Sequence, residues 1–267
     1  MARILLLLSL LLTPLLPTWA ASDEPAQVEL VDGGWRGDAR LVAVVMRLAP
    51  GWKTYWRVPG EGGLPPRFDF SGSVNVKEKR VLWPAPKRFR SPATGETIGF
   101  KHLVVFPVLI TPKDKSAPIR LNLKLNYGIC GEMCMPAQTT TSLLLPPQPR
   151  VDATTRALLD EWLKKTPLMD DGTLKLASVR LARVGGKLAL DVALKGPGAD
   201  EVSDMFVEGV GMAVFGPPER IGGKGEAVVY RLREKGGLVS EKDFAGARVR
   251  LTILRGGKAV ERTITLP

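Results

Sequence analysis

The chain has 267 residues and a formal net charge of +11, which is long enough for one large domain or two of ordinary size. A hydrophobic content of 45%, with 28 glycines and 22 prolines between short apolar runs, indicates a β-rich globular protein and excludes a disordered chain. The net charge favours acidic partners or an anionic membrane surface only weakly, because the basic residues are spread along the sequence, as on a solvated basic surface, and form no basic-aromatic stripe that would indicate nucleic-acid binding.

The first twenty residues have the features of a secretory signal. Arg3 supplies a positive charge, residues 4–16 are mostly apolar, and Thr18 and Ala20 place small residues before a cleavage site. The apolar run is shorter than the ~20 residues of a spanning helix, which leaves an uncleaved anchor as the less favoured alternative. We therefore expect residues 1–20 to be removed and the mature protein to be exported, to a compartment where disulfides persist.

Residues 22–148 are predicted to form a first β domain. Between residues 119 and 127 apolar side chains alternate with polar ones, which is typical of a strand with one buried face. Residues 84–99 contain three prolines and two glycines and are predicted to be a long irregular loop, a feature that is often functional in compact domains. Strands are predicted over residues 39–48, 51–60, 103–110, 119–127 and 139–145, of which the last two form a hairpin.

A helix and a second β domain are predicted to follow. Asp152 can cap a helix over residues 151–165 whose leucines and Trp162 form one apolar stripe. This predicts a helical linker over residues 149–169 and a second β-sandwich domain over residues 170–267, with hairpin turns at its paired glycines. The second domain lacks Cys, His and Trp, so we expect a packing or docking role for it.

The common catalytic and metal-binding motifs do not occur in the sequence. His102 is the only histidine, and there is no G-x-S-x-G, H-E-x-x-H or P-loop motif, nor a G-x-G-x-x-G motif that opens a helix. We therefore predict no cofactor and no dedicated metal site.

Both cysteines lie in one short segment with three residues between them, for which three interpretations are open. A structural disulfide between Cys130 and Cys134 is common in exported proteins, yet a bridge that closes ~5 residues stabilises by only about 2 kcal/mol. Redox exchange needs two sulfurs that pair and separate without refolding, and a strand end beside a loop meets that need. The third interpretation is Cu(I) binding, in which Met133 and Met135 would join the cysteines as soft ligands.

The local field matters because only a thiolate attacks a disulfide. Glu132 lies between the two cysteines and would disfavour the thiolate if its side chain pointed toward them. Lys101 or Arg90 could offset this effect if the loop that carries Arg90 folded over the site.

The first half of the chain contains three distinctive motifs. They are Gly51-Trp-Lys-Thr-Tyr-Trp-Arg57 with the following Pro59-Gly-Glu-Gly-Gly-Leu-Pro-Pro66, Trp83-Pro-Ala-Pro-Lys-Arg-Phe89, and Tyr127-Gly-Ile-Cys-Gly-Glu-Met-Cys-Met-Pro136. These motifs resemble the N-terminal periplasmic domain of the DsbD disulfide reductases, and most of all its ScsB-type branch. The second half of the chain resembles, more weakly, the second immunoglobulin-like unit of ScsB-type proteins. The resemblance implies an all-β fold of two immunoglobulin-like β-sandwich domains joined by a short helical linker.

The resemblance also implies roles for individual residues. Cys134 matches the family cysteine that forms a mixed disulfide with the partner protein, and Cys130 matches the one that resolves it. Tyr55 and Trp56 match a strand whose aromatic side chains line the site. A cap loop is expected within residues 88–100, with Phe89 or Phe100 as the ring that shields the sulfurs.

We therefore expect a stand-alone periplasmic thiol–disulfide interchange protein that acts as a protein-disulfide reductase. Its partners would be thioredoxin-like or disulfide-containing periplasmic proteins, and a separate membrane protein would supply the electrons. This follows because the membrane and thioredoxin domains of the full-length reductases do not occur in these 267 residues. DsbD itself also has a longer spacing between its cysteines. The alternative is a non-enzymatic exported binding or chaperone-like sandwich with a structural disulfide, with or without bound Cu(I).

Overall fold

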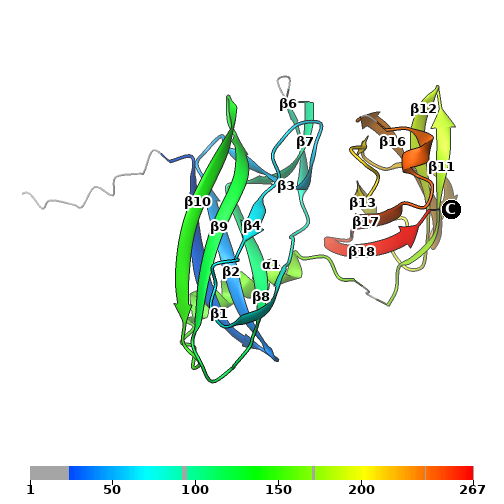
Figure 1. The fold of residues 1–267 in the computed structure, drawn as a ribbon. Coiled ribbons are helices and arrows are strands. Elements are labelled where there is room, and N and C mark those ends of the chain that lie inside the picture. Colours follow the sequence, from blue (N-terminus) through cyan, green and yellow to red (C-terminus); the bar gives the residue numbers. More distant parts are fainter. Residues whose placement is uncertain (1–23, 92–94, 170–171, 238, 267) are drawn as a thin grey trace, which may run out of the picture.

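A computed structural model describes residues 24–91, 95–169, 172–237 and 239–266. These residues form two β-sandwiches that lie side by side (Figure 1). The predicted all-β class is confirmed, since the described residues contain eighteen strands, one α-helix and one short 3-10 helix. The predicted signal over residues 1–20 lies outside the described residues.

The first sandwich contains two packed sheets. Its strands are β1 (Ala26–Arg36), β2 (Ala39–Leu48), β3 (Lys53–Gly60), β4 (Arg67–Asp69), β5 (Val76–Val81), β6 (Lys87–Ser91), β7 (Gly95–Lys101), β8 (Leu103–Pro112), β9 (Ile119–Cys130) and β10 (Cys134–Leu145). One sheet has the order β1-β2-β8-β5, and the other has the order β10-β9-β3-β7-β6 with β4 paired to β9. The predicted alternation in β9 is confirmed, because Leu121, Leu123 and Leu125 are fully buried between the sheets.

The prediction of an irregular loop over residues 84–99 is wrong for most of this segment. Strands β6 and β7 form an antiparallel hairpin in which Phe89 lies opposite Thr97. Two of the prolines, Pro84 and Pro86, precede β6, so they leave its backbone free to pair. Ile98 and the β-branched and aromatic residues around it then favour an extended chain, which the density of Pro and Gly in the segment had obscured.

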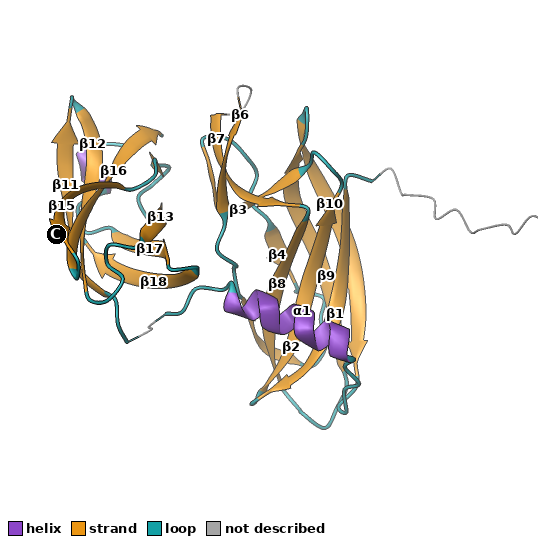
Figure 2. Ribbon diagram, turned by 180° about the vertical axis from the view of Figure 1, so that it is seen from behind, coloured by secondary structure: helices purple, strands orange, loops and turns teal. Residues whose placement is uncertain are grey.

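The predicted helix is confirmed as α1 (Ala153–Lys164). The Asp152 carboxylate caps it by accepting a hydrogen bond from the Thr155 amide at 2.9 Å. The apolar stripe buries Leu159 and Trp162 in the core of the first sandwich, where the helix packs against β1 and β8 (Figure 2). The helix therefore joins the two sandwiches in sequence and also extends the first core.

The second sandwich has a separate hydrophobic core. Its elements are β11 (Lys175–Val184), β12 (Lys187–Lys195), β13 (Val202–Glu208), β14 (Val214–Phe215), β15 (Glu219–Lys224), β16 (Ala227–Gly236), the 3-10 helix η1 (Glu241–Asp243), β17 (Arg248–Arg255) and β18 (Lys258–Thr265). One sheet has the order β11-β12-β16-β14 with β15 paired to β16, and the other has the order β13-β17-β18. The two predicted glycine-pair hairpins are confirmed at Gly185-Gly186 and at Gly256-Gly257, where φ is positive as the turns require.

The second sandwich turns its β13-β17-β18 sheet toward the first (Figure 1). The connecting segment pairs with this sheet, because the Leu168 amide donates to Ala259 O at 3.0 Å and Leu168 O accepts from the Glu261 amide at 2.8 Å. Between the sandwiches, Trp56 of β3 packs on Phe206 of β13 with ring centroids 5.4 Å apart. Both rings are fully buried, so the two sandwiches share an apolar contact.

Candidate functional site

The hairpin of β9 and β10 carries both cysteines at its closed end. Cys130 and Cys134 are the last residue pair of the hairpin register, with Cα atoms 4.0 Å apart, and their sulfurs form a disulfide. The Gly131 amide donates to Met133 O at 3.1 Å across the short turn between them. Because the pair closes a hairpin whose strands are hydrogen-bonded over their whole length, the bond can open without unpairing the sheet.

The two sulfurs differ in their access to solvent. Cys130 is only 3% exposed, because its strand β9 has β10 on one side and β3 on the other. Cys134 belongs to β10, the edge strand of the sheet, and is exposed. Its neighbours Met133 and Met135 are exposed as well. An attacking thiolate from solvent therefore reaches the sulfur of Cys134 and not that of Cys130.

Two lysines lie in register with the disulfide on the neighbouring strands, on the outer face of the sheet. Lys53 of β3 lies opposite Cys130 on one side and opposite Lys101 of β7 on the other. Lys53 is nearly buried, and its Nζ donates to Thr97 Oγ1 at 2.9 Å. Burial, and secondarily the charge of Lys101, lowers the pKa of Lys53. The register thus brings Lys53 next to Cys130, but its amino group is directed to Thr97, and Lys101 Nζ lies 4.9 Å from the Phe89 ring centroid.

A pocket of about 640 Å³ opens beside Cys134. Tyr55 of β3 forms its floor and is held between two glycines. A Cβ on Gly63 would lie 2.3 Å from the Tyr55 ring, and a Cβ on Gly128 would lie 2.8 Å from it, so neither position has room for a side chain. Burial also raises the pKa of the Tyr55 phenol. The lining residues are Tyr55, Glu61, Gly62, Gly63, Leu64, Gly95, Gly128, Cys134, Met135 and Pro136.

One wall of the pocket is the loop over residues 61–66, which follows β3. The Glu61 amide donates to Glu96 O at 2.9 Å, and Leu64 O accepts from the Gly128 amide at the same distance. These bonds fix the loop to β7 and to β9, on either side of Tyr55. Sequence reasoning assigned no function to this loop; its paired glycines were the available signal, because close approach of the backbone to a ring requires them.

The residues predicted to surround the cysteines are divided among different places. Tyr55 lines the pocket beside Cys134. Trp56 points to the opposite side of β3, because side chains alternate along a strand, and packs on Phe206 instead. Phe100 is buried in the core of the first sandwich, edge-on to Phe106 at 5.7 Å. Trp56 and Phe100 do not line the pocket beside Cys134.

Phe89 and Glu132 lie nearer to the surface. Phe89 is partly buried on the outer face of β6, and Lys101 Nζ lies 4.9 Å from its ring centroid. Its role as a shield for the sulfurs stays a prediction. Glu132 is exposed in the turn between the cysteines. Arg90, considered as an offsetting charge, donates to Glu96 Oε2 at 3.2 Å.

Among the described residues, no three side chains of the His, Cys, Asp and Glu types gather in a way that could hold a metal ion. The helices of residues 24–91, 95–169, 172–237 and 239–266 include none with the length and apolar character needed to cross a membrane.

Comparison with known proteins identifies the first sandwich. Residues 21–146 match the family model described as thiol:disulfide interchange protein DsbD, N-terminal. The structure is similar to the crystal structure of the N-terminal periplasmic domain of ScsB from Proteus mirabilis, with a TM-score of 0.67 and 22% sequence identity, over 92% of this chain and 95% of that chain. At this identity the likeness shows a shared fold of both sandwiches. No curated protein matches the chain. The first sandwich therefore belongs to the family of DsbD N-terminal domains.

Proposed function

We propose that the protein is a periplasmic thiol–disulfide interchange protein that passes two electrons through Cys130 and Cys134 to thioredoxin-like or other disulfide-containing partners. The observation that carries this proposal is the unequal access to two bonded sulfurs, one buried and one exposed beside an open pocket. A bridge that only stabilised the hairpin would add little, because it closes a very short loop. An exchange site, in contrast, needs one sulfur in reach of a partner and a second one in reserve.

In the direction of partner reduction, the cycle starts from the dithiol. The Cys134 thiolate attacks one sulfur of the partner's disulfide, a mixed disulfide forms, and the partner's other sulfur leaves as a thiolate and takes up a proton. The Cys130 thiolate then attacks the Cys134 sulfur, which re-forms the Cys130–Cys134 bond and releases the second partner thiolate, which is also protonated. The partner gains two electrons and two protons, and the pair loses them.

The oxidised pair must then be reduced again. A separate membrane donor with a reactive thiolate would attack the exposed Cys134 sulfur, displace the Cys130 thiolate, and complete the exchange with its own second sulfur.

Trapping of the mixed disulfide tests the proposed roles of the two cysteines. Cys130→Ser removes the resolving sulfur, so we expect this variant to accumulate a disulfide-linked complex when it meets an oxidised partner protein. Cys134→Ser leaves only the buried sulfur and should trap little or none. The complexes can be counted on non-reducing gels and identified by mass spectrometry.

The reduction potential of the pair provides the second measurement. A potential near those of exchange-active pairs, above about −300 mV, is expected for the wild-type protein. A pair with a lower potential, together with no complex from Cys130→Ser, would show that the disulfide is structural and would overturn the proposal.

A further inference from the structure

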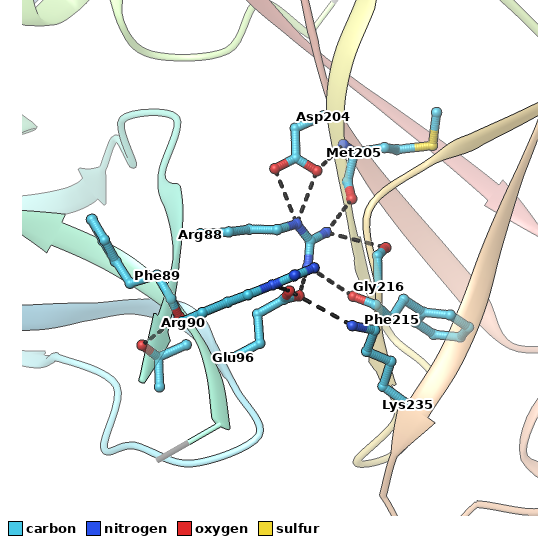
Figure 3. A network of polar contacts seen from close by, with 10 residues as sticks. Arg88, Phe89, Arg90, Glu96, Asp204, Met205, Phe215, Gly216 and Lys235 are labelled. Carbon is cyan, nitrogen blue, oxygen red and sulfur yellow. Dashed lines mark hydrogen bonds and ion pairs between the residues drawn. The ribbon is translucent and has the colours of Figure 1, made fainter. Parts of the chain in front are cut away.

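An arginine of β6 connects the first sandwich to the second. The Arg88 side chain is largely buried, and its Nε lies 3.0 Å from both carboxylate oxygens of Asp204 on β13 (Figure 3). Its two Nη atoms donate to Met205 O at 2.8 Å and to Phe215 O at 2.9 Å. Nη1 also donates to Glu96 Oε1 of β7 at 2.7 Å. One guanidinium group thus joins the β6–β7 hairpin to two strands of the second sandwich.

A second arginine makes the same kind of connection from β3. Arg57 Nε donates to Glu208 Oε1 at 2.7 Å, and Nη2 binds Glu261 and lies 3.3 Å from Thr252 Oγ1. All three partners belong to the β13-β17-β18 sheet. Arg57 stands four positions before Glu61, so this connection holds the chain just ahead of the pocket loop.

Aromatic rings fill the space between the two arginines. The Arg57 guanidinium lies 4.3 Å from the Trp56 ring centroid, and the Arg88 guanidinium lies 4.7 Å from that of Phe206. Trp56 and Phe206 in turn pack on each other. Charged groups that are held in this way against buried rings keep one geometry, because movement would leave them desolvated and unpaired.

Glu96 links this interface to the pocket through its side chain. Its carboxylate is 4% exposed and binds Arg88, Arg90 and, at 3.8 Å, Lys235 of the second sandwich (Figure 3). Although burial raises the pKa of this carboxyl, Arg88 and the other cations outweigh the effect and hold the pKa below its usual range. Glu96 therefore stays ionised and remains clamped between residues of both sandwiches.

The backbone of the same residue holds the pocket wall. Glu96 O accepts the hydrogen bond from the Glu61 amide, and three residues later Leu64 O accepts from Gly128. A Cβ on Gly60 would lie 2.4 Å from Glu96 O, which shows how closely the loop root approaches β7. A continuous set of contacts thus runs from Asp204 through Arg88 and Glu96 to the loop beside Cys134.

We propose that the second sandwich is a positioning element for the exchange reaction, which holds residues 61–64 as a fixed wall beside Cys134 by way of Arg57 and Arg88. This inference rests on the proposed function and adds a part of the site that recognises protein partners. When residues 61–64 are already ordered, the binding of a partner costs less conformational entropy than when binding must order them. A small dithiol needs only the sulfur, so its reaction should not depend on the wall.

The experiment compares Arg88→Ala with a matched variant that leaves the interface intact. Arg231 pairs with Asp191 inside the second sandwich, with Nε and Nη2 both 2.7 Å from the carboxylate, and Arg231→Ala removes the same charge and a similar ion pair. Each protein is reduced under the same conditions by reduced thioredoxin and, separately, by dithiothreitol. Amide hydrogen exchange at Glu61 reports the state of the wall without any redox step.

We expect Arg88→Ala to show about tenfold faster amide exchange at Glu61 and about tenfold slower reduction by thioredoxin, with the dithiothreitol rate within about twofold of wild type. Arg231→Ala should match the wild-type protein in all three. Arg88→Lys keeps the charge without the planar fork of donors and should change in the same direction, which provides a second variant if Arg88→Ala folds poorly.

An unchanged rate of amide hydrogen exchange at Glu61 in both Arg88 variants would overturn the positioning role of the second sandwich. The role of the second sandwich in partner recognition would be overturned if the rate of reduction by thioredoxin were unaffected in the Arg88 variants, or if it fell equally in Arg231→Ala. A wild-type protein that dithiothreitol reduces and thioredoxin does not would overturn it as well. A wild-type disulfide that neither reagent reduces would contradict the proposed function, and amide exchange would still decide whether Arg88 holds the wall.

Discussion

Gly128 shows how single residues shape the pocket beside Cys134. It lies on the outer face of β9, two residues before Cys130, and the Tyr55 ring and the Leu64 carbonyl both occupy the space where its side chain would stand. A side chain there would have to displace the ring or the loop. The small size of this residue therefore decides both the floor and the wall of the pocket.

We expect Gly128→Ala to lower the free energy of unfolding by about 2 kcal/mol, because the new Cβ would lie 2.8 Å from Tyr55 and 2.9 Å from Leu64 O. Chemical denaturation measures the change. Gly72→Ala is the matched control, since its Cβ would meet Asn122 only at 3.7 Å and 3.8 Å, an ordinary contact. If Gly128→Ala lost no more stability than Gly72→Ala, the crowding at Gly128 would have no cost and the prediction would be wrong.

Among the secondary-structure elements, the sequence pattern predicted those that depend on neighbouring residues. The alternation in β9, the glycine pairs of two hairpins and the capped helix α1 could be read because each depends on residues close in sequence. The β6–β7 hairpin was missed because its prolines and glycines suggested a loop. The pocket wall could not be predicted, since it depends on a contact between Glu61 and Glu96 that only the folded sheet creates. Trp56 was assigned to the cysteine site although alternation turns it away.

The β6–β7 hairpin also carries a prediction about pH. The pKa of Glu96 is held below its ordinary 4.5, although burial by itself would raise it, because Arg88 and the other cations outweigh burial. A carboxyl of this kind stabilises the folded state above its unfolded pKa, and that contribution disappears as the pH falls through the lower folded value. Acid should therefore weaken the attachment of this hairpin to the second sandwich.

We expect Glu96→Gln to lower the free energy of unfolding by about 2 kcal/mol at neutral pH, since it leaves buried cations without their partner. The difference from wild type should shrink as the pH falls below about 4. Asp204 also titrates in this range: burial raises its pKa against the opposing effect of Arg88, and the charge of Glu96 adds to the rise, so part of the difference reports on Asp204. Denaturation at a series of pH values gives the curve, and a difference that does not vary with pH would contradict it. Glu241→Gln, in an exposed pair with Arg183, should change little.

For the whole molecule, the main question is whether the two sandwiches behave as one body. The match to the DsbD family ends at residue 146, yet α1, which follows it, buries Leu159 and Trp162 in the first core. The likeness to the ScsB domain covers both sandwiches. The apolar contact of Trp56 with Phe206 is flanked by two arginines that each bind several groups across the interface. An interface of this kind should couple the unfolding of the two cores.

We therefore expect the wild-type protein to unfold in one calorimetric transition, and the double variant Arg57→Ala/Arg88→Ala to unfold in two. The control is Arg183→Ala/Arg231→Ala, which removes two positive charges and two ion pairs that lie within the second sandwich. This control can lower the stability of one core, but it leaves the interface unchanged, so its single transition should shift without splitting. A wild-type protein with two transitions would show that the sandwiches are independent. In that case the second sandwich could not hold the wall beside Cys134 firmly, because an interface too weak to couple the cores would be too weak to fix a loop.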